Sequence, residues 1–186
     1  MSDKKWIDLY NTQRRLQESL RIMPSPWMVK LALLDELGEL IHLVKPFWAW
    51  WKRSDLAEKA KPQLSDLKSR VLDEAADILH FILLNTLAEK EPGDKLDFLI
   101  DSQDYAHNFQ RNPMYGFSFH LRAVAMHVFP MQGITELMKA LTALGNALTK
   151  EYSETVTFTP EELYDAYLEK AKINLVRWGI KPDEAN

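Results

Sequence analysis

Two stretches of the sequence carry the same pattern of acidic residues followed by a histidine. Leu34–His42 reads LDELGELIH and Leu72–His80 reads LDEAADILH, so the pattern L-D-E-x-x-[E/D]-x-x-H occurs twice. On a helix, residues three or four positions apart lie on the same face, so each copy would present its carboxylates and its histidine together. The candidate metal ligands are Glu36, Glu39, Glu74 and Asp77, and the histidines beside them are His42 and His80.

The surroundings of the acids favour a buried site over an exposed one. Around Glu74 and Asp77 most positions are apolar: Ile78, Leu79, Phe81, Ile82, Leu83 and Leu84. A helix that is apolar on all sides belongs in a core, where ionised carboxylates need a partner. Two such helices side by side would bring four acids together, and a divalent metal ion is the simplest way to offset their repulsion. The ordinary alternative is that the acids form a solvated surface and that each histidine is a hydrogen-bonded core or rim residue.

Composition limits the function classes further. The chain has 186 residues, and we expect a single domain over residues 1–186 with one core. Its 27 acidic and 23 basic residues argue against a nucleic-acid partner. The lack of cysteine excludes disulfides, zinc–thiolate sites and thiol nucleophiles. The polar start and the lack of an apolar run of membrane-spanning length predict a cytoplasmic protein with no membrane partner.

The hydrophobic pattern predicts an all-α fold, a helical bundle with the two acidic copies on its central helices. These two helices are expected to run from Pro26 to Val44 and from Asp66 to Glu89. The other expected helices are Trp6–Leu20, a short charged helix over Ser54–Ala60, Phe117–Val128, Ile134–Lys150 and a last helix that ends at Gly179. Asn108–Gly116 is expected to be a loop, and Tyr152–Phe158 is expected to be irregular.

Several of these helices have recognisable start signals. Thr159-Pro160-Glu161-Glu162 predicts a capping box, with a threonine cap, proline at the first helical position and glutamate at the third. Ser25 is expected to cap the first acidic helix and Ser65 the second. Gly38, inside the first acidic helix, costs about 1 kcal/mol relative to alanine. We therefore expect another helix or the substrate to approach closely there.

The last helix carries a second set of polar residues with a common face. Tyr167, Lys170, Asn174 and Arg177 are spaced by three or four residues. Two cations, an amide and a phenol match the donors that grip phosphate oxygens. An ordinary solvated face is equally consistent with this spacing.

Aromatic residues and one glutamine complete the candidates. Trp48, Trp50 and Trp51 lie in Lys45–Arg53, where they could form a wall that stacks a base, part of the core, or an interface between subunits. Gln13, on the inward stripe of the first helix, either faces solvent or is a buried amide that reads a ligand.

Taken together, these segments resemble the all-α NTP pyrophosphatases, and most closely the dimeric dUTPase family. The glutamine motif is similar to Gln13-x-x-Leu16, and the two acidic pairs are similar to Glu36-x-x-Glu39 and Glu74-x-x-Asp77 with His80 and Phe81. The phosphate-binding helix is similar to Tyr167-x-x-Lys170-x-x-x-Asn174-x-x-Arg177. Phe47 and Trp50 fall at the spacing of the family's aromatic motif, but Trp48 replaces the lysine expected between them.

The resemblance implies a nucleoside triphosphate substrate, most closely dUTP, that is hydrolysed to the monophosphate and pyrophosphate. It implies two or three Mg²⁺ ions at the four carboxylates, with Glu39 as the catalytic residue that orients the attacking water. Substrate binding is implied for the remaining residues: the phosphates for Lys170, Asn174, Arg177 and the adjoining Tyr167, and the base and sugar for Gln13, His42, Trp50 and His80. It further implies a homodimer, with Trp50 nearest the substrate and Trp48 or Trp51 packed in the core or against the second subunit.

Three alternatives remain at this level. The preferred nucleotide could be dCTP or another deoxynucleoside triphosphate. Glu39-x-x-His42 and Asp77-x-x-His80 also have the spacing of carboxylate-bridged di-iron bundles, for which Glu136 and Glu169 would supply the additional carboxylates. A non-catalytic helical interaction module would leave the acids without a purpose.

Overall fold

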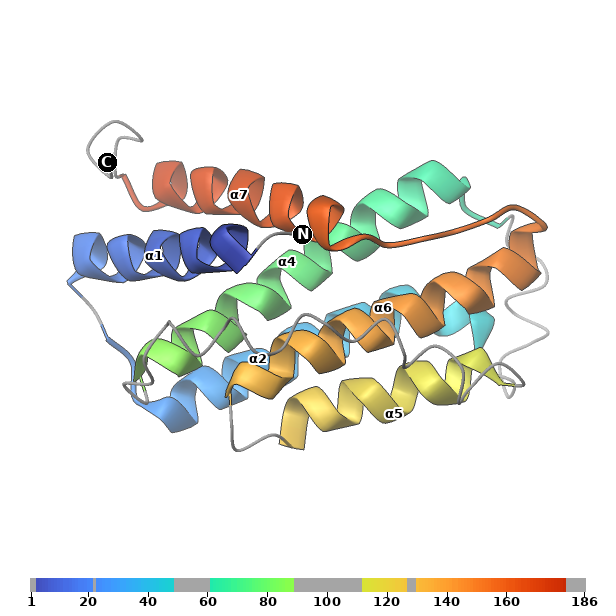
Figure 1. The fold of residues 1–186 in the computed structure, drawn as a ribbon, viewed down its shortest axis with the longest axis horizontal. Helices are drawn as coiled ribbons and strands as arrows, with labels where there is room; N and C mark the ends of the chain where they lie inside the picture. Colours follow the sequence, from blue (N-terminus) through green and yellow to red (C-terminus); the bar gives the residue numbers. More distant parts are fainter. Residues whose placement is uncertain (1–2, 22, 49–60, 89–111, 127–129, 180–186) are drawn as a thin grey trace.

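The computed structural model describes residues 3–21, 23–48, 61–88, 112–126 and 130–179, and these residues form helices without any strand (Figure 1). The elements are α1 (Asp3–Leu20), α2 (Pro26–Leu43), the short 3-10 helix η1 (Lys45–Phe47), α4 (Leu64–Ala88), α5 (Pro113–Met126), α6 (Pro130–Tyr152) and α7 (Pro160–Arg177). The predicted all-α fold is confirmed.

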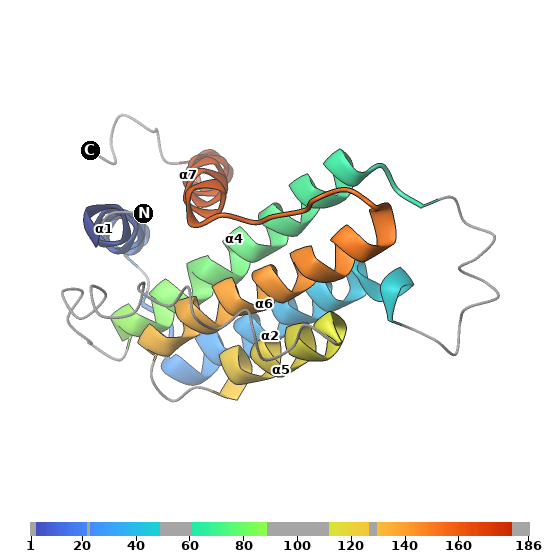
Figure 2. The same ribbon diagram turned by 45° about the vertical axis from the view of Figure 1, so that its right-hand side comes forward.

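Four helices form a bundle, and two more lie against one side of it. α2 packs against α4 and α5, and α6 packs against the same two helices from the other side, which closes a ring of four. α1 and α7 lie on α4, on the side away from α5 (Figures 1 and 2). The two acid-bearing helices, α2 and α4, therefore lie side by side, as predicted.

α4 is the central element of the molecule. It contacts α1, α2, α6 and α7, so apolar residues on most of its sides become buried. Ala75 and Ala76 are fully buried, and their small side chains allow neighbouring helices to come close. This environment explains why residues 75–84 of α4 are mostly apolar.

The start of α7 follows its local sequence. The Thr159 hydroxyl accepts a hydrogen bond from the Glu162 N–H, and the Glu162 carboxylate accepts one from the Thr159 N–H, so the predicted capping box is confirmed. Beyond the last turn Gly179 adopts a φ of 73°, a left-handed conformation that favours glycine.

The two serine caps differ from the prediction. Ser25 is the residue before α2 with Pro26 at the first position, but its hydroxyl makes no capping bond. Ser65 lies inside α4 rather than before it, because the Gln63 carbonyl already accepts a hydrogen bond from the Leu67 N–H.

α5 begins earlier than expected, and the end of the predicted loop is helical. The Asn112 side-chain oxygen accepts a hydrogen bond from the Tyr115 N–H, and Pro113 occupies the first helical position. Asparagine followed by proline is an ordinary helix start, and the prediction of a loop through Gly116 was therefore wrong at this end. α6 likewise starts before Ile134, at Pro130, and extends to Tyr152.

Three further expectations concern the regions between helices. The irregular segment before α7 is confirmed over residues 153–158. No described atom lies within 4 Å of a Cβ built on Gly38, so the expected close approach of another helix is wrong within the described residues. The proposed helix over Ser54–Ala60 lies outside them.

Candidate functional site

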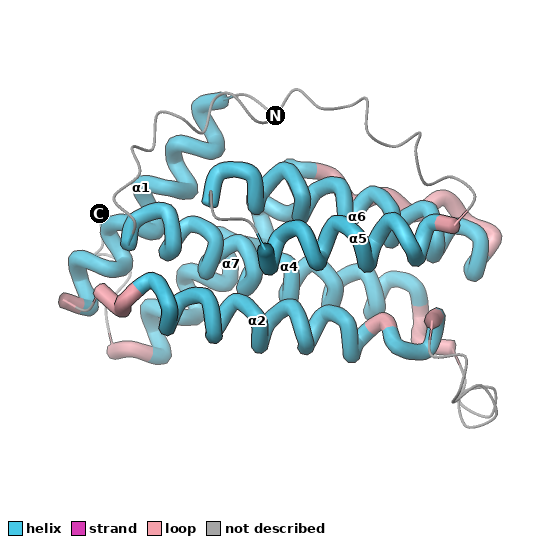
Figure 3. Tube along the Cα trace, turned by 90° about the horizontal axis from the view of Figure 1, so that it is seen from below, coloured by secondary structure: helices cyan, strands magenta, loops and turns pink. Residues whose placement is uncertain are grey.

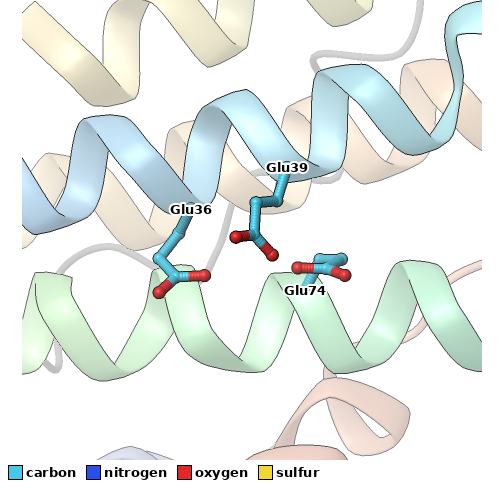
Figure 4. A group of neighbouring side chains, drawn as sticks. All are labelled: Glu36, Glu39 and Glu74. Atoms are coloured by element: carbon cyan, nitrogen blue, oxygen red, sulfur yellow. The ribbon is translucent and has the colours of Figure 1, made fainter.

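Three of the predicted carboxylates meet where α2 faces α4. Oxygens of Glu36 and Glu39 from α2 and of Glu74 from α4 all lie within 4.8 Å of one another. The three side chains point toward a common point between the helices (Figure 4). Three of the four predicted acids, from both copies of the acidic pattern, therefore lie together.

The acids lie at the edge of the helix contact rather than deep in the core. Glu36 and Glu74 are half-buried and Glu39 is exposed. On α2 the neighbouring Leu33 and Leu37 take the buried positions, so the glutamates are left at the margin of the α2–α4 contact. The sequence favoured a buried site, but these acids are at most half-buried, because α4 turns its apolar sides to other helices. Glu39 is therefore accessible to solvent.

Burial and repulsion between the carboxylates both disfavour their charged forms. Burial, together with the charges of Asp77, Glu39 and Glu74, raises the pKa of Glu36 to about 7. Burial and the charges of Glu39 and Asp73 also raise the pKa of Glu74. A hard divalent cation coordinated by oxygen atoms would relieve this repulsion, so the donors fit Mg²⁺.

Asp77, the fourth predicted ligand, is engaged by a lysine from α7. Lys170 Nζ lies 2.6 Å from Asp77 Oδ2 and 3.1 Å from Asp73 Oδ2. Burial raises the pKa of Asp77, although the hydrogen bond and charge of Lys170 oppose this rise. The structure thus places the ammonium group of Lys170 directly beside the carboxylate group. Sequence reasoning missed Asp73, because nothing in its own neighbourhood shows that Lys170 lies opposite.

The predicted face of α7 is divided between buried and exposed positions. Tyr167 and Asn174 are buried, Lys170 is mostly buried, and Arg177 is exposed in the last turn. The Tyr167 hydroxyl donates a hydrogen bond of 2.7 Å to Gln13 Oε1, and burial raises the pKa of Tyr167. The interpretation as an ordinary solvated face is wrong for the tyrosine and the asparagine.

Gln13 is completely buried, so its exposed alternative is excluded. Its oxygen is bonded to Tyr167, whereas its amide nitrogen has no hydrogen-bond partner among the described residues. A buried N–H group without a partner is costly, and a ligand acceptor would satisfy it. The sequence alternative of a buried amide that reads a ligand is the one consistent with this arrangement.

The remaining predicted site residues lie in different surroundings. His80 is buried, and this burial lowers its pKa to about 4, so it is neutral near pH 7. Its ring centroid lies 6.4 Å from that of Trp178, an aromatic neighbour that the sequence analysis did not select. His42 is exposed near the end of α2. Trp50 lies outside the described residues, as does Trp51.

The comparison with protein families identifies the family of this chain. A family model described as dUTPase matches residues 5–180. The chain belongs to the dUTPase family. The match spans α2, α4 and α7 and confirms the predicted dUTPase-type enzyme. Comparisons with curated proteins and with solved structures found no match.

Two observations bear on the alternatives. In this dUTPase-family chain, Glu136 accepts hydrogen bonds from His120 and Lys139. Burial would raise the pKa of Glu136, but these bonds hold it at about 2. Glu169 is exposed and pairs with Lys172. Neither glutamate joins the carboxylate group, so the di-iron ligand set is wrong.

Hydropathy adds one finding about the described helices. None of them combines the length and the apolar character needed to cross a membrane.

Proposed function

We propose that this chain hydrolyses dUTP to dUMP and pyrophosphate in a reaction that depends on Mg²⁺. The observation that carries the proposal is the group of Glu36, Glu39 and Glu74 oxygens within 4.8 Å, in a chain of the dUTPase family. We assign the metal to these three residues and Asp77, with two or three ions. Bound there, Mg²⁺ would offset the charge of the triphosphate and lower the pKa of the attacking water.

Glu39 is the residue that we assign to the water. It is the exposed member of the group, so its carboxylate can accept a hydrogen bond from a water that enters from solvent. Glu36 and Glu74 are more buried than Glu39. This difference in burial supports separate roles for carboxylates of the same type.

The outer phosphates are assigned to α7. Lys170 already lies between this helix and the acids, where its ammonium group can be shared by Asp77 and a phosphate oxygen. Asn174 and Arg177 lie about one and about two turns further along the same helix, and Tyr167 positions α7 through its hydrogen bond to Gln13.

The base and sugar are assigned to side chains of α1, α2 and α4 and to Trp50. The amide nitrogen of Gln13, which has no partner among the described residues, is a donor for a base carbonyl. His80, as a neutral buried ring, can donate or accept. His42 and Trp50 complete the proposed border of this site. Uracil and cytosine share one carbonyl group, so dCTP or another deoxynucleoside triphosphate is the second candidate. We also propose that the protein is a homodimer and that it works in the cytoplasm.

The decisive assay compares canonical nucleoside and deoxynucleoside triphosphates for pyrophosphate release with and without Mg²⁺. We expect dUTP to give the highest kcat/KM and Glu74→Gln to abolish turnover while helicity is retained. Glu161→Gln, an exposed change at the start of α7, is the matched control and should remain active. A fully active Glu74→Gln enzyme would remove the metal-site assignment. Activity on no triphosphate would favour the interaction module.

A further inference from the structure

Asp73 is a carboxylate beside the candidate site that has no role in the proposed reaction. It precedes Glu74 in the sequence, and its side chain is exposed on α4. Asp73 Oδ2 lies 3.1 Å from Lys170 Nζ, and Asp77 Oδ2 lies 2.6 Å from the same nitrogen. Lys170 belongs to α7, which packs against α4 (Figures 1 and 3). Two carboxylates of one helix therefore hold a single ammonium group of the next.

The spacing of the two carboxylates makes this arrangement possible. Asp73 and Asp77 are four residues apart, so they lie on the same face of α4, separated by about 6 Å along its axis. An ammonium group carries three N–H donors. A single contact would leave the Lys170 ammonium group free to rotate about that contact. Two contacts fix its orientation, so the third N–H has a defined direction in which it can meet a ligand oxygen.

The surroundings of Asp73 argue against a mainly stabilising role. Its side chain is 58% exposed and keeps much of its hydration, whereas that of Lys170 is 16% exposed. An ion pair with one partner this exposed contributes little to stability. Burial is the main cause of the raised pKa values of Glu74 and Asp77, and the charge of Asp73 adds to both. Asp73 therefore adds repulsion to the acids, and its contact with Lys170 is the interaction that needs an explanation.

We propose that Asp73 is a positioning residue, which holds the Lys170 ammonium group in the orientation that binds an outer phosphate of the substrate. The inference rests on the proposed function, in which Lys170 binds a phosphate and Asp77 is a metal ligand. In that arrangement Asp77 divides its charge between the ion and Lys170, so it holds the ammonium group less firmly. Asp73 is outside the proposed ligand set and keeps its contact with Lys170. It acts through this lysine and not on the substrate itself.

The expected effect of losing Asp73 has a definite sign. Without Asp73, the flexible Lys170 side chain must be ordered when the phosphate binds, and ordering one such side chain weakens binding by roughly two- to tenfold. Charge alone predicts the opposite result, because the loss of a negative charge near a triphosphate should tighten its binding. The direction of the change therefore separates a positioning role from a simple effect of charge.

The first test is calorimetric titration, in the presence of Mg²⁺, with a dUTP analogue that has an imido group between its α- and β-phosphates and resists hydrolysis. We expect Asp73→Asn to raise the Kd of this analogue by roughly three- to tenfold, and Asp73→Glu to restore most of the affinity. Asp66→Asn, at an exposed acid in the first turn of α4, is the matched control and should bind as the wild type does. Unchanged or tighter binding by Asp73→Asn would overturn the proposal.

A double-mutant cycle tests whether Asp73 acts through Lys170. Asp73→Asn is measured in the wild type and in the Lys170→Ala background, and we expect the loss of analogue binding only in the wild type. dUMP lacks the outer phosphates, so it should bind equally to the wild type and to Asp73→Asn. A loss of the same size in the Lys170→Ala background, or for dUMP, would contradict a role that depends on the lysine and the outer phosphates.

Two further readouts separate positioning from metal binding and from folding. We expect the Mg²⁺ affinity of Asp73→Asn without nucleotide, and its melting temperature, to stay close to those of the wild type, because Asp73 is exposed and outside the ligand set. During turnover the loss should appear in KM and not in kcat, because Lys170 binds the outer phosphates of the bound substrate as well as those of the transition state. A large loss of Mg²⁺ affinity would make Asp73 a metal ligand and refute the positioning role.

The same measurements distinguish this inference from the proposed function. A wild type that neither binds nor hydrolyses any nucleoside triphosphate would remove both. A wild type that releases pyrophosphate as proposed, with an Asp73→Asn variant that binds the analogue equally well, would remove the role of Asp73 alone.

Discussion

At the scale of single residues, the site is a group of carboxylates that folding brings close together. Glu36 lies among Glu39, Glu74 and Asp77, and burial and these charges raise its pKa to about 7. Lys170 is the one cation that the described contacts place on Asp77. Burial and the repulsion between the acids therefore both disfavour their charged forms in the folded protein.

The raised pKa of Glu36 predicts a specific pH dependence. Between pH 4.5 and about 7 the folded protein binds more protons at Glu36 than the unfolded chain, so the free energy of unfolding falls as the pH rises through this window. Glu36→Gln removes this loss. We expect the metal-free variant to be more stable than the wild type at pH 8 by on the order of 1–2 kcal/mol after allowance for solvent screening, and equally stable at pH 4.

Urea unfolding in the presence of a chelator measures this difference. Glu18→Gln, an exposed carboxylate on α1, is the control and should change stability little at either pH. If Glu36→Gln is no more stable than the wild type at pH 8, the repulsion at the site is too weak to support the electrostatic argument.

Lys170 provides the second residue-scale prediction. If its ammonium group binds a phosphate, Lys170→Ala should weaken the binding of the triphosphate by about tenfold to a hundredfold, as expected for the loss of a charge-assisted hydrogen bond. Binding of the corresponding nucleoside should change far less. Lys172→Ala removes an exposed lysine of the same helix and serves as the control. Calorimetric titration of both ligands makes the comparison, and an equal loss for both would move Lys170 away from the phosphates.

At the scale of elements, α6 and the segment that follows it are fitted closely together. Val156 and Phe158 are buried, and the Val156 N–H donates a hydrogen bond of 2.9 Å to Thr149 Oγ1. A Cβ on Gly145 would lie 2.7 Å from the Val156 carbonyl oxygen. The segment leads directly to the capping box of α7, so its position also determines where α7 begins.

This contact predicts the outcome of Gly145→Ala. Alanine at an open helix position would stabilise by about 1 kcal/mol. Here the new methyl group meets backbone that cannot rotate away, so we expect a net loss of roughly 1–3 kcal/mol. Asn146→Ala changes the exposed neighbour and should be neutral or slightly stabilising. Thermal unfolding followed by circular dichroism compares the two variants. A stabilised Gly145→Ala protein would show that residues 153–158 can shift to make room for the methyl group at little cost.

At the scale of the whole molecule, the site joins parts of the chain that are far apart in sequence. α2 and α4 contribute the carboxylates, α7 contributes Lys170, and the Tyr167–Gln13 hydrogen bond ties α7 to α1. All of these elements meet around α4 (Figure 1). A cation bound at the acids would therefore bridge α2 and α4 at the point where their carboxylates repel each other.

Metal binding should accordingly stabilise the entire fold. A ligand that binds only the folded state adds RT ln(1 + [L]/Kd), about 2.7 kcal/mol at a hundredfold excess over Kd. We expect the melting temperature of the wild type to rise by several degrees with saturating Mg²⁺, and this rise to be lost in Glu74→Gln. Glu161→Gln should retain the full rise. A rise of equal size in Glu74→Gln would show that Mg²⁺ acts elsewhere on the protein.

The sequence by itself determined the features that depend on local chemistry. The helical period indicated the helices and placed Glu36 with Glu39 and Glu74 with Asp77, because residues three apart share a face wherever the helix lies. The capping box at Thr159 was likewise predictable from neighbouring residues. The start of α5 was missed although Asn112 and Pro113 carry an ordinary local signal, so that error was one of interpretation.

The tertiary structure decided everything that depends on which helices meet. Only the packing of α4 against α7 brings Lys170 to Asp77 and Asp73, and only the packing of α1 against α7 buries Gln13 beside Tyr167. The pKa of Glu36 and the edge position of the acids follow from the same arrangement. The physical reason is the distance along the chain over which each interaction acts. Helix formation and capping depend on hydrogen bonds between near neighbours in the sequence. Burial and charge–charge contacts depend on residues that come together only when the helices pack.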